Sequence, residues 1–154
     1  MTRSYCRLWE HVIFSTKYHQ PLITKNVKVH LYDFIADQLK KCDCLPLAIN
    51  GAADHVHLLF LSNYKMSLAD IMKQVKGASS YLANKNKLTV EHFGWQDSFG
   101  AFSVSEQNVE IVKRYIQNQE AHHSKKTFRQ EYDELMQSNG LVDDHFGDAF
   151  LNAG

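Results

Sequence analysis

The order of strand-like and helix-like segments along the chain predicts an α+β domain. Runs rich in β-branched and aromatic residues alternate with segments of helical periodicity, and further helical segments follow the last strand. The 154 residues, of which 44% are hydrophobic and 22% charged, have the size and composition of one globular domain. A chain of this length buries enough surface to fold without a disulfide or a structural metal.

The first part of the chain predicts a strand, a helix and a second strand. Residues 5–16 are rich in aromatic and β-branched side chains and read as a strand, and residues 45–50 read as a shorter one. Between them, apolar residues recur at spacings of three and four, which predicts an amphipathic helix over about 25–42. The apolar positions of this helix are Val27, Leu31, Phe34, Ile35 and Leu39.

The middle of the chain predicts a hairpin followed by a second helix and a fourth strand. A turn over residues 51–54 leads into a strand over 55–61. Ser67, with Asp70 three positions later, is typical of a helix start, and this helix extends to about residue 84. A glycine-bearing loop then leads to a short strand over 101–104.

Two further helices follow the fourth strand. Ser105 is expected to cap a helix with apolar positions at Val109, Val112 and Ile116, and a last helix covers about 127–137. The complete order, β-α-β-β-α-β and then helices, is the split βαβ or ferredoxin-like pattern. We therefore expect an antiparallel sheet with helices on one face, additional C-terminal helices, and an opposite face free for a ligand or a second subunit.

The charge distribution separates a basic body from an acidic end. We expect one domain over residues 1–137 and an acidic C-terminal extension over 138–154. All 17 Lys and Arg residues lie at or before Arg129, whereas six of the 17 acidic residues follow it. A basic body favours a polyanionic partner such as nucleic acid, although the formal net charge of the whole chain is zero. The six acids are Glu131, Asp133, Glu134, Asp143, Asp144 and Asp148.

The sequence favours a cytoplasmic protein. It contains no stretch of about 20 apolar residues, the length that a membrane span requires. The first residues do not form the apolar run of a secretory signal peptide. The three cysteines, an odd number, favour a reducing compartment.

The sharpest local motif is His55-Val56-His57 on the third predicted strand. Alternate residues of a strand point to the same side, so the two imidazoles lie on one face, about 6.6 Å apart along the chain. Two imidazoles so placed can share one divalent metal ion. The alternative is a pair of solvated histidines on a half-exposed strand, and the motif alone does not exclude it.

A second pair, Tyr115 and Gln119, is expected to share one face of a helix, because residues four apart are neighbours on a helix surface. A phenol and an amide would then project together. The alternative is a tyrosine at the edge of the core with its hydroxyl in water.

Together these features resemble one family. Four ordered blocks, spanning about His11 to Glu134, are similar to the single-tyrosine HUH transposases carried by small bacterial and archaeal insertion sequences (the IS200/IS605-like family), where HUH means His, hydrophobic residue, His. One small departure is Ser98-Phe99, where similar proteins often carry Gly-Tyr. The blocks are HVIFSTKY at 11–18 with PLI at 21–23, NGAADHVHLL at 50–59, WQDSFGAFSV at 95–104 and RYIQNQEAHH at 114–123.

The resemblance implies a DNA transposase, an enzyme of DNA transposition and recombination. Such enzymes recognise hairpins at element ends, and they cleave and rejoin single-stranded DNA through a 5′-phosphotyrosine intermediate. By position, Tyr115 matches the nucleophile, and His55, His57 and Gln119 match the ligands of Mg²⁺ or Mn²⁺. The resemblance also implies a homodimer in which each tyrosine helix completes the His pair of the partner.

Several further features have open interpretations. Six basic residues could contact DNA phosphates, or could be solvated helix charges. Cys42-Asp43-Cys44 could bind zinc together with the His pair, although nothing else in the sequence requires a structural metal. The alternative function is a catalytically silent module that binds hairpin DNA. The six basic residues are Lys73, Lys76, Lys113, Arg114, Lys125 and Lys126.

Overall fold

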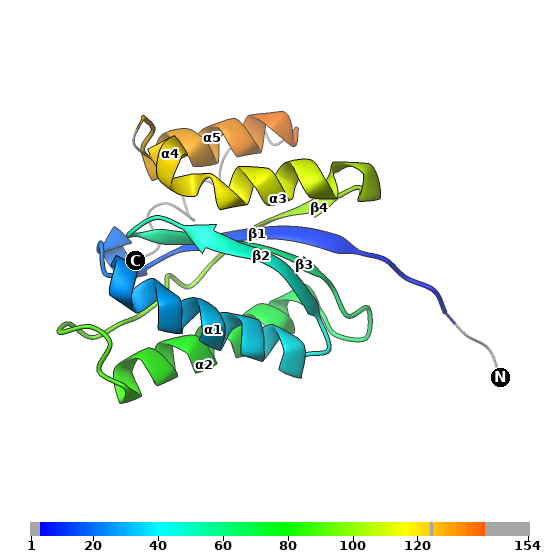
Figure 1. Cartoon of the computed structure of the whole chain (residues 1–154). Helices are drawn as coiled ribbons and strands as arrows, with labels where there is room; N and C mark the ends of the chain where they lie inside the picture. The colour runs from blue at the N-terminus through cyan, green and yellow to red at the C-terminus, as the bar shows by residue number, and fades with distance from the viewer. Residues whose placement is uncertain (1–3, 124, 141–154) are drawn as a thin grey trace.

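Four antiparallel strands form the single sheet of the computed structural model (Figure 1). The structure describes residues 4–123 and 125–140, so most of the predicted acidic extension lies outside the described residues. The strands follow the order β2-β3-β1-β4, and β1 pairs with both β3 and β4. Their bounds are β1 (Trp9–Ser15), β2 (Leu45–Gly51), β3 (His55–Leu61) and β4 (Gly100–Val104).

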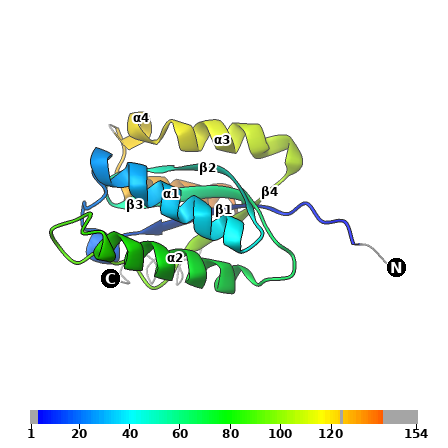
Figure 2. The ribbon, with the colours of Figure 1, turned by 60° about the horizontal axis from the view of Figure 1, so that its bottom comes forward.

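Two long helices, α1 (Lys25–Lys41) and α2 (Leu68–Lys85), cover one face of the sheet, and Figure 2 shows them side by side in front of it. Apolar side chains from alternate positions of the central strands fill the space beneath the helices, because alternate strand residues share a face. Cys42 and Cys44 belong to this core, and the zinc site considered from the sequence is not formed. Core residues from the strands are Val12, Phe14, Val56, Leu58 and Phe60.

The opposite face carries α3 (Val109–Gln117), α4 (Gln119–His123) and α5 (Phe128–Ser138), as Figure 1 shows. The predicted fold class, an α+β ferredoxin-like domain with C-terminal helices, is confirmed. The expectation that this face is free for a ligand or a second subunit is wrong, because the chain covers it with its own C-terminal helices. Two short 3₁₀ turns, Lys17–His19 and Glu106–Asn108, complete the elements.

The local predictions hold where capping chemistry is specific. The side chain of Ser67 accepts a hydrogen bond from the Asp70 backbone N–H at 3.1 Å and starts α2 as expected. Ser105 makes no side-chain capping bond, because the 3₁₀ turn intervenes before α3. The first strand begins at Trp9 rather than at residue 5. Across the described residues, none of the helices is long and apolar enough to cross a membrane.

The turn between β2 and β3 depends on a close backbone approach at Gly51. A Cβ atom at this position would lie 2.1 Å from the backbone oxygen of His55 and 2.8 Å from the Cα of Val56. Both neighbours are backbone atoms of β3, so a side-chain rotation could not relieve the clash. Glycine at this position therefore lets β3 start directly at His55.

We expect Gly51→Ala to destabilise the fold by about 1–3 kcal/mol, because the backbone of β3 must shift to admit the methyl group. Gly77→Ala is the matched control, since nothing lies within 4 Å of its added Cβ. Gly77 lies inside α2, so alanine there should stabilise by about 0.5–1 kcal/mol. Urea unfolding of both variants measures the difference, and equal effects would contradict this account of the turn.

Candidate active site at the His pair

The two histidines of the motif lie on the face of β3 beneath the C-terminal helices. Both side chains of His55 and His57 are fully buried, while Val56 between them points into the opposite core. The predicted alternation is confirmed, and the alternative of two solvated histidines is wrong. Because β3 is a central strand, paired on both sides, its backbone holds both imidazoles in fixed positions.

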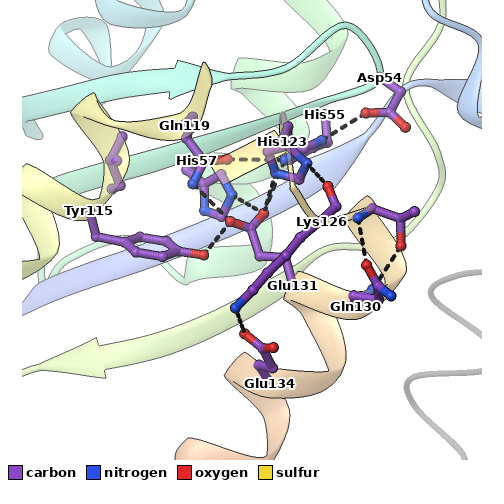
Figure 3. Close-up of polar contacts among 12 residues, drawn as sticks. Asp54, His55, His57, Tyr115, Gln119, His123, Lys126, Gln130, Glu131 and Glu134 are labelled. Atoms are coloured by element: carbon purple, nitrogen blue, oxygen red, sulfur yellow. Dashed lines mark hydrogen bonds and ion pairs between the residues drawn. The ribbon is translucent and has the colours of Figure 1, made fainter. Parts of the chain in front are cut away.

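The segment that carries Tyr115 and Gln119 packs on the sheet face that holds the His pair, although it does not form one continuous helix. We expected one helix through Tyr115 and Gln119, whereas α3 ends at Gln117 and α4 begins at Gln119. The Asn50 side chain donates hydrogen bonds to the backbone oxygens of Ile116 at 3.0 Å and of Gln117 at 3.2 Å. These bonds from β2 hold the chain at the break between α3 and α4. The side chains of Tyr115 and Gln119 still face the His pair (Figure 3).

One carboxylate, that of Glu131 on α5, lies at the centre of the site and is 3% exposed. Figure 3 shows five side chains converging on it. Its Oε1 contacts three imidazoles, and its Oε2 accepts hydrogen bonds from the phenol and the amide. The Oε1 partners are Nε2 of His55 at 3.2 Å, Nε2 of His57 at 2.9 Å and Nε2 of His123 at 2.9 Å; the Oε2 partners are the Tyr115 hydroxyl and Nε2 of Gln119 at 2.8 Å.

Sequence reasoning missed this role for Glu131 and counted the residue among the charges of the acidic end. The signal was present in the helical period. Apolar residues of α5 recur at three and four from Phe128, and position 131 falls on the same stripe. An acid on the buried stripe of an amphipathic helix requires a polar partner inside the fold. The stripe is Phe128, Glu131, Tyr132, Leu135 and Met136.

The protonation of the site follows from burial and from these contacts. Burial raises the pKa of the Glu131 carboxyl, but the hydrogen bonds from three imidazoles outweigh it and hold this pKa well below its usual range. Burial and the nearby carboxylate raise the pKa of the Tyr115 phenol well above its usual value. In this arrangement Glu131 is therefore ionised. The phenol keeps its proton and donates a hydrogen bond to the carboxylate.

Two further side chains contact the Nδ1 atoms of the His pair, the ring nitrogens that do not face Glu131. Asp54 Oδ1 lies 2.8 Å from Nδ1 of His55, and Nε2 of His11 lies 2.8 Å from Nδ1 of His57. Burial lowers the pKa of His57 to about 4 and that of His11 to about 3, so both rings are neutral near pH 7. Burial also opposes the charged form of His55, but its bonds to two carboxylates prevail and raise its pKa.

The donor set fits a divalent cation. The ligand atoms of His55, His57 and Glu131 lie within 4.8 Å of one another, and all three residues are buried. Oε1 of Gln119, the third ligand that the resemblance implies, lies 3.2 Å from Nε2 of His55. Imidazole nitrogens with carboxylate and amide oxygens form a mixed set without thiolates, which suits a hard or borderline cation.

The six predicted DNA-contacting residues are divided between two sides of the molecule. Lys73 and Lys76 lie on α2, on the face of the sheet opposite the His pair. The Lys76 ammonium is partly buried, which lowers its pKa to about 8, and it donates to the backbone oxygen of Ser98 at 3.0 Å. The other four accompany the candidate site: Lys113 and Arg114 on α3, and Lys125 and Lys126 just before α5.

Two sequence comparisons with known proteins give matches over most of the chain. The profile of the family described as "Transposase IS200 like" matches residues 4–119. The ISDra2 transposase of Deinococcus radiodurans is 28% identical over 115 residues, which are 71% of this chain and 81% of that protein.

Two solved structures share the fold. A crystal structure of a candidate transposase from Deinococcus radiodurans R1 is similar with a TM-score of 0.60 and 27% identity, covering 77% of this chain and 96% of that one. A REP-associated tyrosine transposase bound to a REP hairpin matches with a TM-score of 0.57 and 13% identity, covering 80% and 73%. With the profile spanning residues 4–119, the chain belongs to the IS200-like transposase family.

Proposed function

We propose that this transposase cleaves and rejoins single-stranded DNA by transesterification, with Tyr115 as the nucleophile and a 5′-phosphotyrosine intermediate. One observation carries the proposal. The hydroxyl of Tyr115 and the Nε2 atoms of His55 and His57 contact the two oxygens of a single carboxylate. A nucleophile and a cation-binding pair are thereby held at one point, which phosphoryl transfer requires.

We assign the binding of Mg²⁺ or Mn²⁺ to His55, His57 and Gln119, and we add Glu131 as an oxygen ligand. When bound, such a cation neutralises negative charge on a phosphate and so permits attack by an anionic oxygen. The burial of all four side chains keeps the donor atoms in place and excludes bulk water from around them.

The proposed step balances with groups of this chain. Oε2 of Glu131 accepts the hydroxyl proton of Tyr115, to which it is already hydrogen-bonded. The phenolate oxygen forms a bond to the scissile phosphorus, and the bond from phosphorus to the 3′ oxygen breaks. The departing 3′ oxygen takes up the proton that Glu131 accepted and becomes a hydroxyl, which returns Glu131 to its ionised form. The same steps in reverse rejoin a strand, so the reaction needs no external energy source.

We propose hairpin-bearing single-stranded DNA as the substrate. The support is a fold shared with a REP-associated transposase bound to a REP hairpin, together with cationic side chains beside the site. A catalytically silent module that binds hairpins is the alternative function. It offers no reason to bury a phenol against a carboxylate that also holds two imidazoles.

We expect Tyr115→Phe to abolish the covalent protein–DNA adduct while leaving hairpin binding unchanged, because only the nucleophilic oxygen is removed. A denaturing gel with labelled hairpin DNA from the ends of its own element, run with Mn²⁺ or with EDTA, measures the adduct. Tyr81→Phe is the control, since Tyr81 is exposed on α2. A surviving adduct would refute the nucleophile assignment, and an adduct-free wild type with intact DNA binding would favour the silent module.

We expect Glu131→Ala to weaken Mn²⁺ binding by about tenfold or more, because a charged oxygen ligand is lost. In EDTA the same variant should lose about 2–4 kcal/mol of stability, since five polar partners, of which His55, His57 and Gln119 are buried, lose their acceptor. Glu134→Ala is the control, because Glu134 is exposed and pairs only with Lys126 among the contacts described. Tighter Mn²⁺ binding by Glu131→Ala would show that the carboxylate competes with the cation.

The assembly is proposed as a homodimer, and its sites can be tested for sharing between chains. Tyr115 and Gln119 contact the His pair network of their own chain, so we expect each site to be complete within one chain. A mixture of Tyr115→Phe and His57→Ala proteins should then form no adduct. Recovery of adduct in the mixture would establish the arrangement that the family resemblance implies, with each tyrosine helix completing the partner's site.

A further inference from the structure

His11 is a buried polar residue that contacts His57 but is neither a proposed metal ligand nor the proposed nucleophile. It lies on β1, is 4% exposed, and stands directly opposite Leu59 in the antiparallel pair. His57 stands opposite Ile13, so the two histidines are diagonal neighbours on the same face of the sheet. Nε2 of His11 is 2.8 Å from Nδ1 of His57, and the ring centroids are 5.1 Å apart.

The contacts around His57 fix the hydrogen positions in the cation-free protein. Nε2 of His57 lies 2.9 Å from Oε1 of Glu131, which as an ionised carboxylate can only accept. A neutral imidazole carries one hydrogen, so His57 carries it on Nε2 and has a bare Nδ1. Nε2 of His11 must then carry a hydrogen and donate it to that nitrogen.

Cation binding reverses this pattern. His57 would hold a cation through the lone pair of Nε2, the nitrogen that faces Glu131, so the hydrogen of the neutral ring would then have to sit on Nδ1. Nδ1 then donates, and Nε2 of His11 has to accept. Each of the two rings keeps one hydrogen throughout, because that hydrogen moves from Nε2 to Nδ1. His11 and His57 together therefore release no proton.

We propose that His11 is a positioning residue that allows His57 to exchange tautomers when the metal site fills. This inference rests on the proposed metal site, because it concerns a ligand of that site. The partner of His57 has to donate in one state and accept in the other, and a neutral imidazole can do both.

His55, the other histidine of the His55-Val56-His57 motif, differs from His57 in this respect. Nδ1 of His55 faces Oδ1 of Asp54 at 2.8 Å, and a carboxylate accepts in every state of the site. The hydrogen on Nδ1 of His55 therefore stays in place when a cation binds. The two ligands of one metal are thus supported by different chemistry, a fixed acceptor for His55 and a reversible partner for His57.

The role predicts a specific ranking of His11 variants. His11→Leu fills the space but can neither donate nor accept, so it strands the hydrogen of His57 on the Glu131 side. We expect Mn²⁺ binding to weaken by about 10–100-fold, the range for lost partners of metal-bound histidines. His11→Gln can both donate and accept through its amide, so it should stay within about threefold of wild type. His30→Leu on the exposed surface of α1 is the control and should not differ.

The experiment combines calorimetric Mn²⁺ titration of these proteins with long-range ¹H–¹⁵N spectra of histidine-labelled wild type. The spectra are recorded first in EDTA and then with diamagnetic Mg²⁺. We expect the hydrogen of His57 on Nε2 in EDTA and on Nδ1 with Mg²⁺, while His55 keeps its Nδ1 hydrogen in both. Melting temperatures and hairpin binding of each variant separate a tautomer effect from loss of the fold.

Several results would overturn the inference. These are a His57 hydrogen already on Nδ1 in EDTA, no change of tautomer with Mg²⁺, wild-type affinity in a folded His11→Leu protein, or equal weakness in a folded His11→Gln protein. If wild type binds neither ion, the proposed metal site fails first, and the EDTA spectrum still tests the contact of His11 with His57. Adduct formation depends on Tyr115, so a failed tautomer exchange leaves the proposed chemistry standing.

Discussion

The organisation of the site depends on one buried carboxylate. Glu131 contacts the imidazoles of the site and the phenol of Tyr115, and it connects β3 with the C-terminal helices (Figure 3). Its negative charge is tolerated in the interior because five donors surround it. The same charge keeps the phenol protonated, so the arrangement described is one in which the proposed nucleophile is held but not yet activated.

The sheet explains why the carboxylate meets the histidines at all. β3 is central, and its alternation sends Val56 into the core beneath α1 and α2 while both imidazoles face the C-terminal helices. Gly51 allows β3 to begin at His55, and Asn50 next to it anchors the end of α3. The last two residues of β2 thus place the His pair and the helix that carries Tyr115 against each other.

The parts that were predictable from sequence are those governed by local periodicity and capping. The order of strands and helices along the chain, the common face of His55 and His57, and the start of α2 at Ser67 follow from local sequence patterns. The break at Asn118 was not predictable, because its cause is a side chain on β2, 66 positions from Ile116. The coverage of the site by α5 was missed for a different reason. Glu131 was counted among the acidic residues that follow Arg129, whereas its position in the helical period places it on the buried apolar stripe of α5.

The contacts couple the proposed nucleophile and the proposed cation site through one carboxylate. A cation held by His55 and His57 would replace the hydrogens that their Nε2 atoms now offer to Oε1 of Glu131, which would leave that oxygen with His123 as its one imidazole partner among the contacts described. The carboxylate then needs other positive charge, and it can obtain it as a ligand of the ion or as the acceptor of the phenolic proton on Oε2. Either change lowers the cost of a phenolate at Tyr115. Filling of the proposed cation site and activation of the proposed nucleophile would therefore be linked by the electrostatics of one side chain on α5.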